Sequence, residues 1–185
     1  VEPRGGETAR RYDKDSIGES AYFVSLNRGK QSLELSLRDN QDLKLLKCIL
    51  ERADVFIRNT APGTMDSVGL KSDLLLDIYK RLIVVDIFGY GQDSDYRDMK
   101  AYDLLIQAEG GLCSITGTED DPVKVGISIA DLGTGMNAYT AVLEALIKRE
   151  NTGRGSHIEL AMFDTVAEWM SCLLYTSDAA DDRVS

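Results

Sequence analysis

Residues 82–87 read Leu82-Ile83-Val84-Val85-Asp86-Ile87, and this run decides the fold. A short apolar run rich in β-branched residues predicts a strand buried on both faces of a sheet. Upstream, residues 53–57 predict a second short strand, and residues 73–80 predict a helix between the two. Strand, helix and strand in this order are typical of parallel βαβ units. The expected fold class is therefore α/β, a Rossmann-like parallel sheet with helices on both faces.

The segments after residue 87 continue the same alternation. A helix over residues 101–109 is broken by Gly110-Gly111, and a turn at 117–122 leads into a predicted strand at 123–129. A long helix follows, with Gly153 as its expected C-cap, then a strand at 157–162 and a helix capped by Asp164. The expected buried stripe of the long helix comprises Met136, Tyr139, Val142, Leu143, Leu146 and Ile147.

The segments before residue 53 are read in the same way. Residues 21–26 and 32–37 predict two strands that flank the turn Asn27-Arg28-Gly29-Lys30. Asp39 or Asn40 is expected to cap a helix, because the apolar residues that follow have helical spacing.

Composition limits the function. The chain has 185 residues, 43% hydrophobic and 28% charged, which fits one globular domain. Its net charge of −10 argues against nucleic-acid binding but leaves room for an anionic ligand. No apolar run approaches the ~20 residues that cross a bilayer. Cys48, Cys113 and Cys172 are widely spaced, which predicts free thiols in a reducing cytoplasm and no structural zinc site.

The local signal for chemistry is Ile129-Ala130-Asp131-Leu132-Gly133-Thr134-Gly135-Met136. A carboxylate between a strand and a helix lies where α/β sheets build their sites. Glycines let a ligand approach the backbone, and the helix start stabilises anionic charge. From these residues alone an ordinary helix N-cap is the preferred reading of Asp131.

Several segments together carry a resemblance. Residues 25–30, 53–55, 62–63, 89–92, 101–103, 131–136 and 152–155 resemble, in order and approximate spacing, those of class III coenzyme A transferases. The resemblance implies that Asp131 is the covalent nucleophile in transfer of coenzyme A from an acyl-CoA to a small carboxylic acid. It implies coenzyme A contacts for Asn59 and Lys100 and an acyl-site position for Tyr102, which is also readable as a core aromatic.

Arg28 and Lys30 are expected near the phosphates of coenzyme A, with two solvated turn cations as the alternative. No resident cofactor and no metal are expected, only the coenzyme A thioester as substrate. Family members often have an arginine where Ser67 stands here, so one phosphate contact is in question.

The α-methylacyl-CoA racemases, a related branch, use a His–Asp pair whose histidine would stand at Tyr102. The single histidine, His157, matches no catalytic position and is read as a strand-end residue. Transferase is therefore preferred to racemase, and a third reading is a coenzyme A-binding chain without catalysis.

The resemblance also predicts domain organisation. Residues 1–171 are expected to be part of a large domain whose beginning, second domain and returning C-terminal segment are absent. Residues 172–185 resemble a translated sequencing adapter, the alternative being a native acidic tail. The full-length protein is expected to be a cytoplasmic, interlocked homodimer without nucleic-acid or membrane partners.

Overall fold

The computed structural model describes residues 1–13, 18–118 and 120–181, with side chains described through residue 173. The chain divides into two compact units, Val1–Arg52 and Ala53–Ser185. Among the described residues, none of the helices combines the length and apolar character needed to cross a bilayer.

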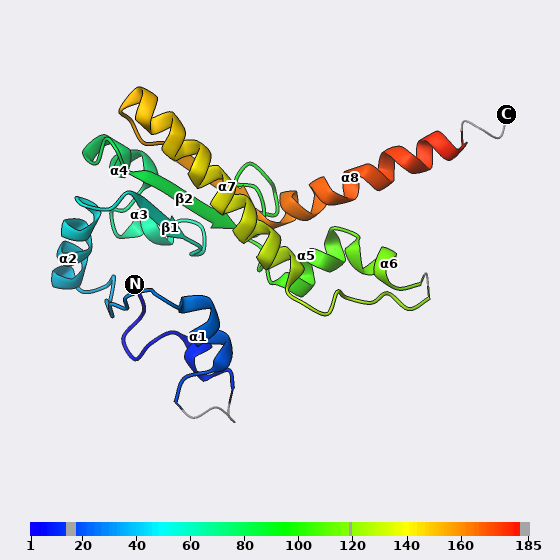
Figure 1. Cartoon of the computed structure of the whole chain (residues 1–185), viewed down its shortest axis with the longest axis horizontal. Helices are drawn as coiled ribbons and strands as arrows, with labels where there is room; N and C mark the ends of the chain where they lie inside the picture. Colours follow the sequence, from blue (N-terminus) through cyan, green and yellow to red (C-terminus); the bar gives the residue numbers. More distant parts are fainter. Residues whose placement is uncertain (14–17, 119, 182–185) are drawn as a thin grey trace. The chain divides into compact units, whose positions relative to one another are not determined.

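The second unit contains a parallel sheet of three strands in the order β1-β2-β3 (Figure 1). These are β1 (Val55–Arg58), β2 (Ile83–Phe88) and β3 (His157–Ala161). The predicted central run is the middle strand, with Ile83 paired to Val55 and Val84 paired to His157. Because β2 has a neighbour on each side, its buried backbone groups are hydrogen-bonded. The predicted α/β class is confirmed.

Helices of the second unit lie between the strands and after them in the sequence. They are α3 (Thr64–Ser67), α4 (Ser72–Ile78), α5 (Asp103–Glu109), α6 (Leu112–Thr116), α7 (Ile129–Thr152) and α8 (Met162–Asp181). Side chains alternate across β2. Ile83 and Val85 pack with Ala138 and Ala145 of α7, whereas Asp86 accepts a hydrogen bond from Ser72 at the start of α4. Thus α7 covers one face and α4 the other.

The first unit contains η1 (Thr8–Arg11), α1 (Ala21–Asn27) and α2 (Asn40–Leu50). The strand predicted at 21–26 is wrong, because this segment is α1. Ser20 caps it, its Oγ accepting a hydrogen bond from the Phe23 N–H at 3.1 Å. The strand predicted at 32–37 is also wrong. It forms a single parallel bridge, Glu2 with Glu34, and a lone bridge does not make a ladder.

The cap of α2 is as expected. The Asp39 carboxylate accepts hydrogen bonds from the N–H groups of Gln41 and Asp42, at 2.7 and 3.2 Å.

The strand predicted at 123–129 is the third error. Its backbone groups bond to helices instead: the Val123 N–H donates to the Cys113 carbonyl and the Val125 N–H to Gln107 Oε1. With these partners the segment is irregular, and within the described part of the chain no strand pairs with it. The chain then enters α7 at Ile129, so that Asp131 lies in the first turn of a helix and not at the end of a strand.

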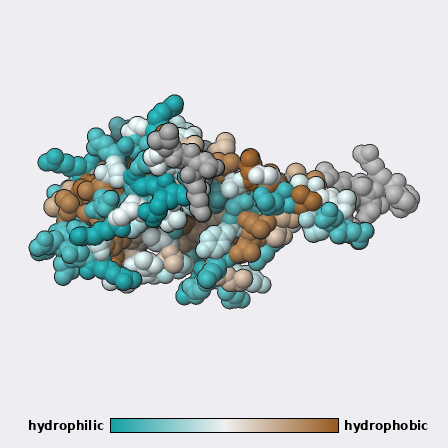
Figure 2. Space-filling model, turned by 90° about the horizontal axis from the view of Figure 1, so that it is seen from below, coloured by the Kyte–Doolittle hydropathy of each residue, from teal (hydrophilic) through white to brown (hydrophobic). Residues whose placement is uncertain are grey.

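The buried stripe predicted for α7 is only partly correct. Val142 and Leu146 pack against the sheet cluster, but Met136, Tyr139 and Ile147 are 67–70% exposed. The buried face consists mainly of small residues: Ala130, Gly133, Thr134, Ala138 and Ala145. Helical spacing identifies an apolar stripe without showing which stripe meets the sheet. Figure 2 shows hydrophobic areas within the hydrophilic surface of the molecule.

The predicted ends of two helices, α5 and α7, are confirmed. Gly153 follows α7 in the left-handed conformation, with φ +70°, and its N–H donates to the Arg149 carbonyl. Gly110 and Gly111 separate α5 from α6. The cap predicted at Asp164 is wrong, because this residue lies inside α8, which begins two residues earlier at Met162.

Candidate active site at the start of helix α7

Asp131 lies where α7 meets α5. The residue in the N-cap position, Ser128, makes no side-chain capping bond. The carboxylate of Asp103, the first residue of α5, takes that role. Its Oδ1 accepts hydrogen bonds from the N–H groups of Ala130 at 2.8 Å and Asp131 at 3.4 Å. The free N–H groups at the helix start are therefore bonded by a residue from a different helix.

Asp103 is itself held in place. Its Oδ2 accepts a hydrogen bond from Gln107 Nε2 at 2.6 Å, and Gln107 is fully buried. Gln107 Oε1 in turn accepts from the Val125 N–H at 2.8 Å. This chain of bonds fixes the start of α5, the segment before α7 and the first turn of α7 relative to one another.

The electrostatics of the site act on the carboxyl group of Asp131. Partial burial raises its pKa, and the negative charge of Asp103 raises it further. The residue is nevertheless exposed. The site thus presents an accessible carboxylate that is more basic than an ordinary aspartate.

The two glycines after Asp131 have different roles. A Cβ on Gly133 would lie 2.0 Å from the Trp169 ring of α8, so this glycine permits helix packing. A Cβ on Gly135 would meet nothing within 4 Å. Gly135 stands one turn after Asp131, and a side chain there would lean back toward it. Only Gly135 fits the expectation of a glycine that lets a ligand approach.

Two further predicted site residues lie near the same helix start. Tyr102 precedes Asp103 in the N-cap position of α5 and is 68% exposed. Its reading as a core aromatic is therefore wrong. Lys100 is exposed two residues earlier in the chain. The structure brings these two positions to the end of α5 whose carboxylate holds α7.

Asn59 lies directly after β1 and is exposed. The helix α7 runs antiparallel to the strands, since its C-terminal loop returns to the beginning of β2, where the Gly155 N–H donates to the Lys80 carbonyl. The first turn of α7 is therefore on the same side as the carboxyl ends of the strands. Asn59 and Asp131 share that side of the sheet, as parallel α/β sites do.

Arg28 and Lys30 belong to the first unit, where they follow α1. Both are exposed, and Lys30 Nζ donates to Asn27 Oδ1 at 3.1 Å. With Phe23 they line a cavity of about 680 Å³. Their expected contact with phosphates stays a prediction.

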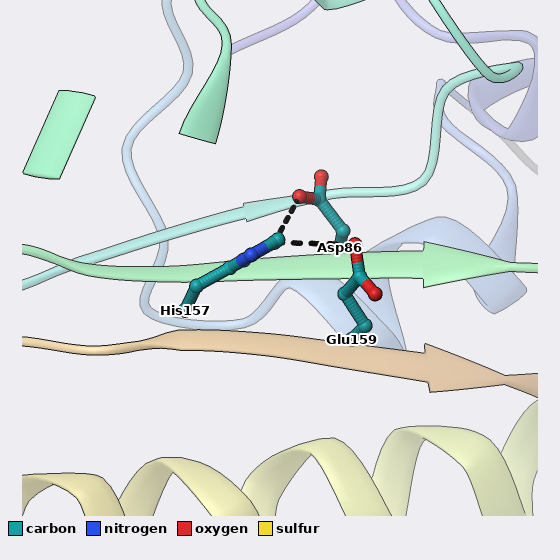
Figure 3. A group of neighbouring side chains, drawn as sticks. All are labelled: Asp86, His157 and Glu159. Carbon is teal, nitrogen blue, oxygen red and sulfur yellow. Dashed lines mark hydrogen bonds and ion pairs between the residues drawn. The ribbon is translucent and has the colours of Figure 1, made fainter. Parts of the chain in front are cut away.

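A second group of polar residues was missed from the sequence. The buried Asp86 carboxylate accepts hydrogen bonds from Arg58 and Ser72. His157 Nε2 lies 2.7 Å from Asp86 Oδ2 (Figure 3). Burial raises the pKa of Asp86, but the bonds from Arg58, Ser72 and His157 outweigh it and hold that pKa below its usual value. The sequence feature that could have revealed this group is Asp86 itself, a charged residue inside the otherwise apolar run 82–87.

Comparison with known proteins agrees with this architecture. CoA-transferase family III matches residues 1–185. A formyl-CoA:oxalate CoA-transferase of Streptomyces avermitilis is 41% identical over 145 residues, 78% of this chain and 35% of that protein. The human succinyl-CoA:glutarate CoA-transferase is 33% identical over 171 residues, 91% of this chain and 39% of that protein.

A crystal structure of a CAIB/BAIF family protein from Brucella suis superposes with a TM-score of 0.90 at 32% identity. The match covers 97% of this chain and 49% of that one. The chain therefore spans less than half the length of each of these three proteins.

Proposed function

The chain belongs to CoA-transferase family III, and on this premise we propose that the full-length protein transfers coenzyme A from an acyl-CoA to a free carboxylic acid. The observation that carries the proposal is the exposed Asp131 carboxylate in the first turn of α7, with a raised pKa and the space beside Gly135 open. Relatives named for oxalate and glutarate transfer support small carboxylic acids as the substrate class.

In the proposed mechanism Asp131 is the nucleophile. Its carboxylate oxygen attacks the thioester carbonyl, the carbon–sulfur bond breaks, and coenzyme A leaves as a thiolate. The product is a mixed anhydride between Asp131 and the acyl group. The thiolate then attacks the aspartyl carbonyl and releases the donor acid, which leaves an aspartyl–coenzyme A thioester. The acceptor carboxylate attacks that thioester and the same steps run in reverse, restoring Asp131. Covalent catalysis divides the transfer into steps of similar energy.

The surroundings of Asp131 suit this role. A raised pKa means a more basic and hence more nucleophilic carboxylate once the proton is lost. The dipole of α7 favours negative charge at its N-terminus, which includes the oxyanion that forms on each attack. Asp103 accepts hydrogen bonds from the N–H groups of Ala130 and Asp131. Its role is therefore to orient this turn of α7, and it does not contact the substrate in this mechanism.

The remaining predicted residues are proposed as substrate contacts. Lys100 and Asn59 are exposed on the side of the sheet that carries Asp131 and would bind coenzyme A. The exposed ring of Tyr102 would line the acyl site. Arg28 and Lys30 would bind phosphate oxygens, a contact to which point charges are suited.

The racemase alternative finds no support in the position of the only histidine. His157 is bound to Asp86 on the face of the sheet that α4 covers, whereas Asp131 belongs to α7 on the other face. A proton carrier at Asp131 would have to be a residue other than histidine within this chain.

We also propose that the full-length protein is a cytoplasmic homodimer without a permanently bound organic cofactor. Cys48 and Cys113 are free thiols, which fits a reducing compartment. The exposed apolar side chains Met136, Tyr139 and Ile147 on α7 support burial against further protein.

Mass spectrometry of the full-length protein tests the mechanism. After incubation with formyl-, acetyl- or succinyl-CoA, we expect a coenzyme A adduct on the peptide that contains Asp131, removable by hydroxylamine and absent from Asp131→Asn. Deuterium exchange at the acyl α-carbon without an adduct would instead identify racemase chemistry.

A further inference from the structure

The group Asp86, His157 and Glu159 lies apart from the proposed active site. Asp86 comes from β2 and the other two residues from β3, and their side chains point toward one another (Figure 3). One ligand atom from each residue lies within 4.8 Å of those of the other two. They occupy the α4 face of the sheet, opposite α7. The chemistry proposed for Asp131 does not use them.

We propose that these three residues bind a divalent first-row transition metal ion such as Zn²⁺. One imidazole nitrogen and two carboxylates form a donor set that suits zinc, and the imidazole selects against Mg²⁺ and Ca²⁺. The inference stands independently of the transfer activity.

The distances are close to those that such an ion requires. Tetrahedral zinc with bonds of ~2.0–2.1 Å places its ligand atoms about 3.3–3.4 Å apart. His157 Nε2 is 2.7 Å from Asp86 Oδ2 and 3.8 Å from Glu159 Oε1. These values lie on either side of the required separation. Small side-chain rotations that open the first pair, and close the second pair and the Asp86–Glu159 pair from within 4.8 Å, would bring the three atoms to bonding distance of one ion.

The ligands differ in how firmly they are held. Asp86 is fixed by Ser72 at 2.7 Å and by Arg58, partners that would orient it as outer-shell residues of a metal site. His157 and Glu159 have exposed side-chain fractions of 25% and 53%. The site is therefore rigid at its base and accessible from solvent, which gives the ion a path of entry.

The cavity beside the site has the charge that a divalent cation needs. Its volume is about 210 Å³, and it is lined by four carboxylates, Asp66, Asp73, Asp86 and Glu159, and by two cationic side chains, Arg58 and Lys71. With His157 neutral, the lining carries a net charge of −2. The guanidinium of Arg58 weakens the field at Asp86, but the lining as a whole favours a dication.

One side chain in the lining of this cavity has a buried donor without a hydrogen-bond partner. Gln92 lines this cavity, and its Nε2 is buried without a hydrogen-bond partner among the described residues. A buried donor left without an acceptor costs free energy. A hydroxide on zinc offers such an acceptor, since three protein ligands leave zinc a fourth position for water and the ion lowers the pKa of that water to about 7.

The test is Zn²⁺ titration of the full-length protein after EDTA treatment, by isothermal calorimetry, with the visible absorption of bound Co²⁺ as a second readout. The variants are Glu159→Gln and His157→Gln, with the exposed Glu144→Gln on α7 as the matched control. Asp86→Asn is unsuitable because it leaves the buried Arg58 without its carboxylate. Melting curves of each variant check the fold.

We expect one equivalent of Zn²⁺, not displaced by millimolar Mg²⁺. Both site variants should raise the dissociation constant for Zn²⁺ at least about tenfold, since even the loss of an outer-shell partner lowers metal affinity by this factor. Glu144→Gln should leave the dissociation constant unchanged. Absence of stoichiometric binding would overturn the proposal. So would equal affinity of wild type and both variants, or displacement by Mg²⁺.

Discussion

Asp103 and Asp131 are joined through the backbone at the start of α7: Asp103 Oδ1 accepts the N–H of Asp131 at 3.4 Å and that of Ala130 at 2.8 Å. One aspartate thus positions the turn that displays the other, while its charge raises the pKa of its neighbour's carboxyl group. The arrangement separates a positioning residue from the proposed nucleophile.

Asp131→Asn in the full-length protein should reduce transfer at least about a thousandfold, as expected when a covalent nucleophile is lost. The amide is nearly isosteric, so thermal stability should change little. Steady-state transfer from an acyl-CoA to oxalate or glutarate measures the loss, with Glu144→Gln on the same helix as control. Retention of a tenth of the activity would exclude Asp131 as nucleophile.

Asp103→Asn should shift the acidic limb of the pH–rate profile to lower pH. The variant removes the negative charge that raises the pKa of Asp131, so that carboxyl group ionises at a lower pH. The amide oxygen still accepts the backbone N–H groups, while the amide nitrogen can no longer accept the bond from Gln107 Nε2. Asp103→Ala removes both effects and should cost about 1–2 kcal/mol of stability, the loss typical of a helix cap. An acidic limb at the same pH in wild type and both variants would contradict the effect of the Asp103 charge on the pKa of Asp131.

Gly133→Ala and Gly135→Ala should change the free energy of unfolding in opposite directions. A methyl group on Gly133 collides with the Trp169 ring and should destabilise by about 1–3 kcal/mol. On Gly135 it meets no atom and should stabilise α7 by up to about 1 kcal/mol through helix propensity. Chemical denaturation measures both. Gly135→Leu should then lower transfer by covering Asp131; full activity of that variant would refute the proposed approach path.

Asp86→Asn should destabilise the protein by about 3–5 kcal/mol at neutral pH, because Arg58 stays buried without its partner. The folded-state pKa of Asp86 is lowered from 3.8, so its contribution is present above that pH and is lost as the pH falls through the folded value. Unfolding curves of variant and wild type should accordingly converge at acidic pH. Equal stability at pH 7 would show that the network contributes nothing.

The 185-residue chain on its own should self-associate through α7. Met136 and Ile147 are 70% and 67% exposed, and contiguous apolar surface of this kind drives association. Met136→Glu with Ile147→Glu should shift the chain toward monomer in sedimentation velocity, whereas exchanging the exposed Glu144 and Lys148 for glutamine should not. A monomeric wild-type chain would mean that this face needs no partner.

The sequence predicted the sheet because each strand is encoded by its own local run of apolar residues. It failed at residues 21–26, where the Ser20 Oγ accepts a hydrogen bond from the first turn and favours α1, and at 123–129, which bonds to helices. The resemblance placed Asp131 in the proposed site and included Asp103 in a matching segment, but it did not reveal the bond by which Asp103 caps α7, which spans 28 positions of sequence.

The sequence by itself determined the parallel α/β fold through local periodicity and the family through its short motifs, and the resemblance to that family implied Asp131 as the proposed nucleophile. The tertiary structure alone decided which stripe of α7 meets the sheet, which glycine is open, and that Arg58, Asp86 and His157 converge. The reason is physical: periodicity is a property of neighbouring residues, whereas burial, charge coupling and metal-ligand geometry arise between segments that only the folded chain brings together.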